Sequence, residues 1–215
     1  MTATTETPVT RKAARPRADA LRNRERIVAA AREMFTEFGP EAPLDEIARR
    51  AGVGNATVYR NFPDRDALVR EVVCSVMDRT VRAAEQALSE TGDAFEALER
   101  FAHTAADERI SALCPMISST FDQCHPDLEE ARRRAESLVA QLMDRARAAG
   151  QLRDDVEYGD LMVGVAQLSR PPAGTACMNA DRFVHRHIQL FLDGMRAPAP
   201  SVLPGTAVTV EDLRR

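Results

Sequence analysis

The sequence lacks any long uninterrupted hydrophobic run. Its longest apolar stretches are broken by charged residues well before the roughly 20 residues that a bilayer-spanning helix requires. The first residues also lack the apolar core of a signal peptide. We therefore expect a soluble cytoplasmic protein that does not interact with a membrane.

Motifs of catalysis are also missing. The chain has no glycine-rich phosphate loop, paired acid motif, metal-binding cluster or nucleophile signature, so we expect no enzyme activity and no cofactor. The four cysteines show no CxxC pairing, and we interpret them as small buried side chains in a reducing compartment. They are Cys74, Cys114, Cys124 and Cys177. A redox or metal role for Cys114, Cys124 and His125 remains an alternative.

Composition indicates a globular protein in which charge is segregated along the chain. Of the 215 residues, 44% are hydrophobic and 29% are charged, which suffices for one sizeable helical domain or for two smaller units. The net charge is −4, but residues 1–70 hold 13 Lys or Arg against 10 Asp or Glu, a balance of +3. Residues 71–215 hold the remaining 16 against 23, a balance of −7.

Positive charge is densest near the N-terminus. Residues 11–26 carry seven basic and two acidic side chains, a local balance of +5 that suits a polyanion. Residues 1–18, which include Arg15 and Arg17, have no apolar periodicity and are predicted to form a disordered basic arm. The alternative is an ordinary solvated tail.

Apolar residues recur at helical spacing through most of the chain, and no alternating segment indicates a strand. The first helix is predicted to carry a core-facing stripe and to end at Gly39-Pro40; the stripe comprises Ile27, Ala30, Ala31, Met34, Phe35 and Phe38. Further helices are predicted from Pro63-Asp64 to about Leu88 and at roughly 93–110, 115–122, 126–149, 157–169 and 179–196. The fold class is therefore all-α. The proline-rich residues 197–215 are predicted to form a flexible tail.

Two short helices follow the first one and are separated by a sharp turn. Leu44, Ile47, Ala48 and Ala51 form the apolar stripe of one, and Gly52-Val53-Gly54 leads into a second at about residues 55–61. Val58 and Phe62 are predicted to face inward. The remaining side chains of that helix have no core partner at this spacing and are free to face a ligand; they are Asn55, Ala56, Thr57, Tyr59 and Arg60.

Residues 44–68, LDEIARRAGVGNATVYRNFPDRDAL, resemble the DNA-binding signature of the tetracycline-repressor (TetR) family. The resemblance implies a helix-turn-helix domain at residues 19–66 and an effector-binding and dimerisation domain at residues 67–196, with about nine helices in total. It also implies a regulator that binds double-stranded DNA, most often a repressor that a small molecule releases. A helical protein-interaction adaptor without DNA binding is the alternative function.

The family pattern assigns roles to residues of the second short helix. Thr57 and Tyr59 are assigned to phosphates and thymine methyl groups, and Asn55, Ala56 and Arg60 to base edges. Arg60 is expected to pair with guanine, with a phosphate contact as the alternative. Arg65 is expected to clamp a phosphate.

Three positions depart from the family pattern. Pro43 and Gly54 stand where many family members have a threonine and a serine that cap the following helix. Because proline offers neither a hydroxyl nor an amide N–H, the phosphate contact of that threonine is expected to be missing. Asn61 replaces a common histidine and can still donate a hydrogen bond. The basic arm, through Arg15 and Arg17, is expected to compensate through the minor groove.

Helices 157–169 and 179–196 carry apolar side chains on more than one stripe, which predicts a second protein surface against them. A homodimer that binds a palindromic operator is therefore expected, with a thick monomer core as the alternative. The assigned dimer residues are Leu161, Gly164, Val165, Val184, Ile188, Phe191 and Met195.

An effector pocket is expected between the middle helices. Soft apolar walls with one or two polar groups suit an unidentified, largely apolar small molecule. The assigned residues are Phe101, His103, Met116, Phe121, Met143 and Met162, with Gln123 as a second polar candidate. The alternative for each apolar member is plain core.

Overall fold

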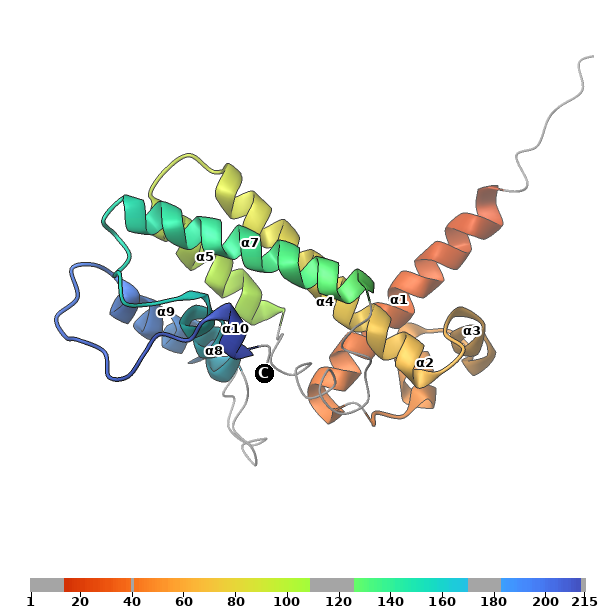
Figure 1. The fold of residues 1–215 in the computed structure, drawn as a ribbon. Helices are drawn as coiled ribbons and strands as arrows, with labels where there is room; N and C mark the ends of the chain where they lie inside the picture. Colours follow the sequence, from red (N-terminus) through yellow and green to blue (C-terminus); the bar gives the residue numbers. More distant parts are fainter. Residues whose placement is uncertain (1–13, 40, 109–125, 170–182, 214–215) are drawn as a thin grey trace, which may run out of the picture. The chain divides into compact units, whose positions relative to one another are not determined.

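The computed structural model describes residues 14–39, 41–108, 126–169 and 183–213. Nine helices and no β-strand occur within these ranges, which confirms the predicted all-α class (Figure 1). The chain divides into two compact units, Met1–Val72 and Val73–Arg215. The boundary falls within α4 (Arg65–Ser89), and each unit is described by itself below.

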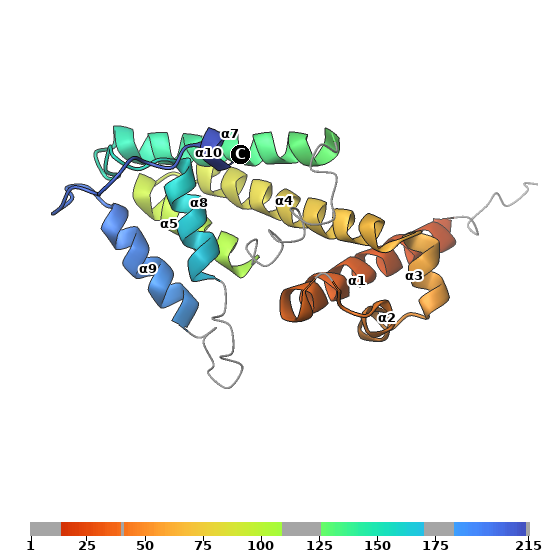
Figure 2. The ribbon, with the colours of Figure 1, turned by 60° about the horizontal axis from the view of Figure 1, so that its bottom comes forward.

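The first unit consists of α1 (Ala14–Phe38), α2 (Leu44–Ala51), α3 (Asn55–Asn61) and the beginning of α4. Helix α2 packs against both α1 and α3 (Figure 2). Large buried side chains from every one of these helices form the core, among them Ile27, Met34, Phe35, Ile47, Val58, Phe62 and Leu68.

Helix α1 differs from the sequence prediction at both ends. It begins at Ala14, inside the segment that was predicted to be disordered. At the other end Phe38, which was predicted to face the core, is 59% exposed. Phe38 is the last residue of α1, and the core-facing stripe ends one turn earlier at Phe35.

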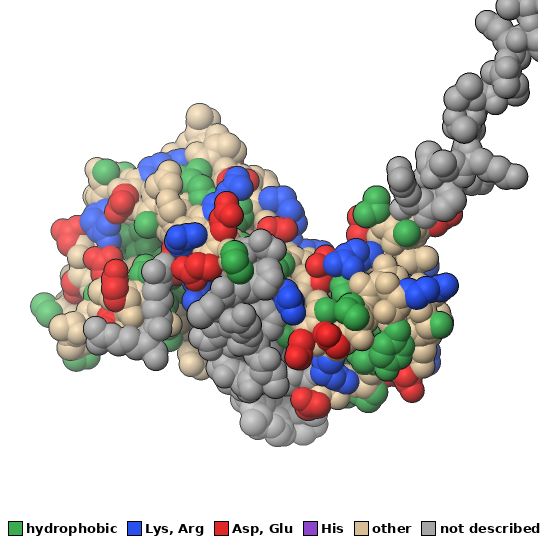
Figure 3. Space-filling view, turned by 45° about the vertical axis from the view of Figure 1, so that its right-hand side comes forward, with side chains coloured by type: hydrophobic (Ala, Val, Ile, Leu, Met, Phe, Trp, Pro, Cys, Tyr) green, Lys and Arg blue, Asp and Glu red, His purple; other side chains and the backbone are tan. Residues whose placement is uncertain are grey.

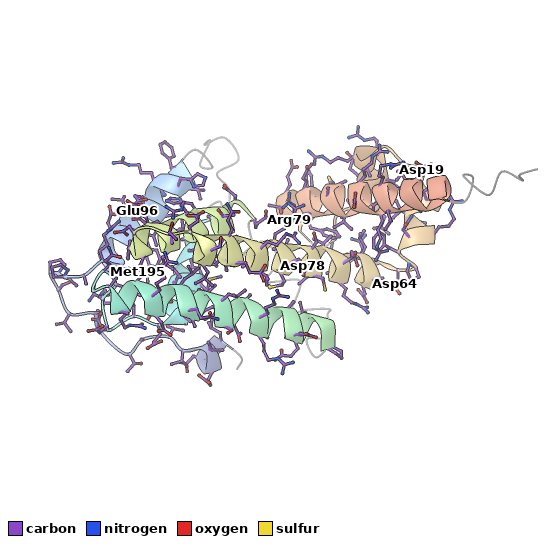
Figure 4. The ribbon with its side chains drawn as sticks, turned by 90° about the horizontal axis from the view of Figure 1, so that it is seen from above. Asp19, Asp64, Asp78, Arg79, Glu96 and Met195 are labelled. Carbon is purple, nitrogen blue, oxygen red and sulfur yellow. The ribbon has the colours of Figure 1, made fainter. Side chains whose placement is uncertain are left out.

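The start of α4 agrees with the sequence prediction. Asp64, labelled in Figure 4, precedes the helix, and its Oδ1 accepts a hydrogen bond from the backbone N–H of Ala67 at 2.7 Å. An acidic side chain here satisfies an amide that has no partner within the helix. The Pro63-Asp64 pair therefore positions the chain as it leaves α3.

The second unit contains the rest of α4 together with α5 (Ala94–Asp107), α7 (Pro126–Ala148), α8 (Tyr158–Leu168), α9 (Val184–Met195) and α10 (Val210–Leu213). Helix α5 packs against α7, α8 and α9, as Figures 1 and 2 show. Its buried face supplies much of a single hydrophobic core, to which α7, α8 and α9 also contribute.

The C-terminal segment corrects another prediction, because residues 197–213 are packed on the second unit rather than forming a free tail. The backbone N–H of Gly159 donates to the carbonyl of Val208 at 2.9 Å, and that of Ala197 donates to the carbonyl of Gln151 at 2.9 Å. Arg153, only 6% exposed, donates to the carbonyl of Ser201 at 2.9 Å. These polar contacts hold a segment whose apolar side chains are largely exposed, as at Val202, which is 90% exposed.

None of the helices in the described part of the chain combines the length and apolar character that crossing a bilayer requires. Cys74 on α4 is half-buried. Cys114, Cys124, His125 and Cys177 lie outside the described residues, as does the helix predicted at 115–122.

Candidate nucleic-acid interface

The turn between α2 and α3 depends on Gly52. Its φ of +64° lies in the left-handed region that side chains disfavour, and its backbone N–H donates to the carbonyl of Arg49 at 3.1 Å. Val53 N–H donates to the carbonyl of Ala48, which closes α2. No side-chain hydrogen bond caps α2 at Pro43 or α3 at Gly54, as the departures from the family pattern predicted.

Helix α3 is anchored by two apolar side chains and leaves its opposite face exposed. Val58 is 1% exposed and Phe62 just after the helix is 2% exposed. By contrast Tyr59 is 53% exposed, and Asn55, Ala56 and Arg60 are also exposed, while Thr57 is half-buried. This agrees with the expectation that these side chains have no core partners.

The exposed face of α3 carries internal hydrogen bonds. Arg60 Nη2 donates to Thr57 Oγ1 at 2.9 Å, which draws the guanidinium back along the helix. Asn61 Nδ2 donates to the carbonyl of Thr57 at 2.7 Å, and Asn55 Nδ2 donates to Asp45 Oδ1 at 2.6 Å. These hydrogen bonds link the polar side chains of this face to one another, to the α3 backbone and to α2.

Arg65, the first residue of α4, is tied to the segment between α1 and α2. Its Nη1 donates to the carbonyl of Ala42 at 2.8 Å. This contact was not expected, because the family pattern assigned Arg65 only to a phosphate. Sequence spacing gives no sign of a bond across 23 residues.

Several arginines counted in the local positive charge of residues 11–26 are bound within the first unit. Arg24 donates to both carboxylate oxygens of Glu71 and to the carbonyl of Asn61, and Arg26 donates to the carbonyl of Gly52. Arg22 pairs with Asp19. The structure therefore corrects the assumption that the whole local charge is available to a polyanion.

The side chains of Arg15 and Arg17 lie outside the described residues. On the face of the molecule in Figure 3, basic and acidic side chains are interspersed over the first unit. In α2, Arg49 hydrogen-bonds Glu46 and holds the pKa of that carboxyl below its usual value. Glu46 in turn raises the pKa of Arg49.

Comparisons with known proteins bear on this helix pair. Residues 27–72 match the family described as bacterial regulatory proteins, tetR family, and residues 93–197 match the transcriptional regulator SbtR-like C-terminal domain. The crystal structure of the TetR transcriptional regulator SCO0520 from Streptomyces coelicolor is 32% identical, with a TM-score of 0.60 over 82% of this chain and 99% of that chain. The chain belongs to the TetR family. It is a DNA-binding transcriptional regulator with an N-terminal helix-turn-helix, and not an enzyme.

Other TetR-family relatives agree. The TetR transcription regulatory protein from Mycobacterium vanbaalenii is 31% identical, with a TM-score of 0.55 over 85% of this chain and 99% of that one. The HTH-type transcriptional repressor LfrR from Mycolicibacterium smegmatis is 36% identical over 40% of this chain and 45% of its own length. The LfrR crystal structure, in complex with proflavine, shares the fold at 23% identity with a TM-score of 0.59, over 85% of this chain and 99% of that one. The chain spans less than half the length of the curated relatives it matches.

Four of the seven residues assigned to the TetR dimer need correction. Leu161, Val165, Ile188 and Met195 are each at most 3% exposed and belong to the core of their own chain. The other three are half-buried: Val184 and Phe191 pack against the edge of that core, and Gly164 lies against the Phe191 ring. A Cβ at Gly164 would lie 2.3 Å from that ring. The glycine therefore permits close packing of α8 and α9 within one chain.

Three apolar side chains on or next to α8 and α9 that do face outward were not among the residues assigned to the dimer from the sequence. Val163 is 38% exposed, Phe183 40% and Leu190 58%. Phe183, the N-cap of α9, lies seven residues before Leu190, which places the two on the same side of this helix. The sequence indicated an outward apolar stripe because these helices carry apolar residues on more than one side. Periodicity alone does not show which of those sides faces the core.

The residues assigned to an effector pocket are dispersed between core and surface. Phe101 and Met143 are at most 2% exposed within the hydrophobic core, and Met162 is half-buried against it. His103 lies at the junction of α5 and α9, with Nδ1 3.0 Å from His185 Nδ1 and Nε2 3.0 Å from Gln189 Oε1. Met116, Phe121 and Gln123 lie outside the described residues.

Proposed function

We propose that this TetR-family chain is a cytoplasmic, ligand-responsive repressor that binds a palindromic operator as a homodimer and leaves it when a small molecule binds. The observation that carries the proposal is the exposed polar face of α3, held on the buried Val58 and Phe62. Support for repression comes from the name of LfrR, and support for a ligand comes from the proflavine in its structure.

Helix α3 is proposed to enter the major groove, which is about 12 Å wide and admits one helix. Asn55, Ala56 and Arg60 then lie beside base edges. Arg60 offers only donors, which matches the two acceptors of guanine and discriminates against other bases by about 1–3 kcal/mol.

The remaining contacts are proposed to position the helix on the phosphates rather than to read sequence. Thr57 and Tyr59 reach phosphates and thymine methyl groups, Asn61 can donate a further hydrogen bond, and Arg65 binds a phosphate. Arg15 and Arg17 are proposed to follow the minor groove.

A second copy of the chain is the proposed partner for the outward stripe of α8 and α9. Val163, Phe183 and Leu190 expose apolar surface that a stable protein usually covers. Helix-turn-helix units bind strongly only in pairs, whose recognition helices lie about 34 Å apart in successive major-groove turns. The stripe is proposed in place of the four assigned residues that are buried in the core, and the half-buried Gly164, Val184 and Phe191 remain proposed dimer residues.

The effector is proposed to act on the core of the second unit, where Phe101, Met143 and Met162 supply soft apolar walls and His103 a polar contact. A ligand that favours a dimer with a different spacing of its two α3 helices would shift the population away from the DNA-bound form.

The DNA part of the proposal is tested by selecting binding sites from a random duplex pool and measuring fluorescence anisotropy on the selected site. Arg60→Ala is expected to weaken binding by about 1–3 kcal/mol and to relax the preference at one base pair per half-site. The matched control is Arg82→Ala, which removes the same charge from an exposed position on α4. Equal effects of the two variants would contradict base reading by α3.

The dimer is tested by sedimentation velocity of Leu190→Glu. A charge on the outward stripe is expected to give folded monomers that bind a half-site weakly. Ala140→Glu, at an exposed position of α7, adds the same charge outside the stripe and is the control. A Leu190→Glu protein that remains dimeric and binds the full operator would contradict the stripe as the dimer surface.

A further inference from the structure

The hydrogen bond between Asp45 and Asn55 joins α2 to the first residue of the recognition helix. Asn55 Nδ2 donates to Asp45 Oδ1 at 2.6 Å, and both side chains are exposed. The bond therefore spans the surface that carries the proposed base-reading residues, and it fixes a side chain of α3 from a different helix.

The chemistry of the two groups fixes which way the amide faces. An ionised carboxylate only accepts hydrogen bonds, so the NH₂ group of Asn55 must face Asp45. Turning the amide over would place its carbonyl oxygen against the carboxylate and lose the bond. The Asn55 Oδ1 atom and the second N–H are then left to contact DNA.

We infer that Asp45 is a positioning residue that holds the Asn55 amide in the orientation that reads adenine. This inference rests on the proposed docking of α3 in the major groove. Adenine presents an amino donor at N6 and an acceptor at N7, which match Oδ1 and the remaining N–H of Asn55. Guanine presents two acceptors at this edge and thymine presents one. These acceptors would face Asn55 Oδ1 and the Asp45 carboxylate, which also only accept, so no hydrogen bond could form there.

The same carboxylate has a cost in overall affinity. The first helix of a helix-turn-helix crosses the DNA backbone, so an exposed negative charge on α2 repels phosphates. Asp45 therefore lowers binding to every sequence while it sharpens the choice of one base. Asp45 and Glu46 both lie in the first turn of α2, where the helix dipole stabilises a negative side chain. A control must therefore separate the loss of this stabilisation from the loss of the bond to Asn55.

The test uses the full chain and the operator selected by the wild-type protein. Each base pair of one half-site is replaced in turn, and the dissociation constant is measured by anisotropy at several salt concentrations. Wild type is expected to prefer adenine over guanine at one position by roughly 5- to 150-fold. Asn55→Ala identifies that position, because the preference is lost there and kept elsewhere.

Asp45→Asn is expected to bind all duplexes more tightly and to reduce the adenine preference at the same position to about 3-fold or less, because an amide at residue 45 accepts either orientation of Asn55. Combining Asp45→Asn with Asn55→Ala should give the base preference of Asn55→Ala alone. The control Glu46→Gln removes a neighbouring charge of α2 that is bound to Arg49, and should raise affinity without changing base preference.

Melting curves establish that each variant folds, and Asp45→Ser serves as a second variant should Asp45→Asn unfold. The inference is overturned if a folded Asp45 variant keeps the wild-type preference at the position lost in Asn55→Ala, or if Asn55→Ala weakens all duplexes equally. If wild type selects no duplex at all, the proposed function fails instead.

Discussion

Replacing Arg24 with alanine is expected to destabilise the first unit while leaving the salt dependence of DNA binding unchanged. Arg24 Nε and Nη2 donate to the two carboxylate oxygens of Glu71 at 3.2 and 2.8 Å, and Nη1 donates to the carbonyl of Asn61 at 3.0 Å. Its guanidinium also lies 4.4 Å from the centre of the Phe62 ring. The side chain thus joins α1 to the end of α3 and to α4.

The magnitude follows from these contacts. The side chains of Arg24 and Glu71 are 37% and 38% exposed, so solvent screens the ion pair to about 0.2–1 kcal/mol. The part-buried hydrogen bond to the Asn61 carbonyl adds about 1 kcal/mol, and the contact with Phe62 adds about 0.5–1 kcal/mol. The total is about 2 kcal/mol, which lowers the Tm of a chain of this size by about 4–8 °C.

The assay combines thermal unfolding followed by circular dichroism with salt-dependent anisotropy on the selected operator. Arg22→Ala is the matched control, because its partner Asp19 is exposed and the pair is expected to contribute less than about 1 kcal/mol. The reasoning is refuted if Arg24→Ala melts like wild type and lowers the logarithmic salt slope by about 1 per chain, since that result identifies a phosphate contact.

Three further predictions concern single backbone or capping positions. Gly52→Ala is expected to cost about 1–2 kcal/mol in chemical unfolding, because φ at this residue is +64°; an unchanged urea midpoint would contradict a rigid turn. Asp93 is the N-cap of α5, and the backbone N–H of Glu96 is the main cause of its lowered pKa. The ionised Asp93 therefore stabilises the fold at pH values above the usual aspartate pKa of about 3.9. This stabilisation is lost as the pH falls through the pKa of Asp93 in the folded protein. Asp93→Asn should therefore flatten the acid limb of the urea midpoint measured from about pH 5 to 2, and an identical limb would argue against this role. Gly159→Ala should release the C-terminal segment, since a Cβ there would lie 2.4 Å from the Val208 carbonyl oxygen; amide exchange at residues 197–213 should rise, and unchanged protection would refute the contact.

The sequence predicted helix α3 well because its pattern is local. Val58 and Phe62 are the large aliphatic and phenyl side chains of a short segment, so they face the core, and Asn55, Ala56, Tyr59 and Arg60 are left exposed. The start of α4 was equally predictable, since Asp64 caps the helix within a single turn. Helix type and approximate bounds follow from such short-range features.

Contacts between distant residues were not predictable in this way. Nothing in the spacing of Arg24 and Glu71 shows that they meet, so Arg24 was counted as part of the free positive charge of residues 11–26. In α9, both Ile188 and Leu190 are apolar, and only packing decides that the first is buried while the second is 58% exposed. The proline-rich C-terminal segment was misjudged because polar contacts such as that of Arg153 hold it in place.

Residues 197–213 contact the start of α8, so a probe on this segment can report on structural changes in the second unit. Val208 N–H donates to Asp160 Oδ1 at 3.2 Å, and Leu213 at the end of α10 is 44% exposed. An environment-sensitive dye attached at position 213 through an introduced thiol would lie beside the packed helices and away from α3 in the sequence. Its emission would report on rearrangements of α8 during titration with candidate compounds, without a label on the operator.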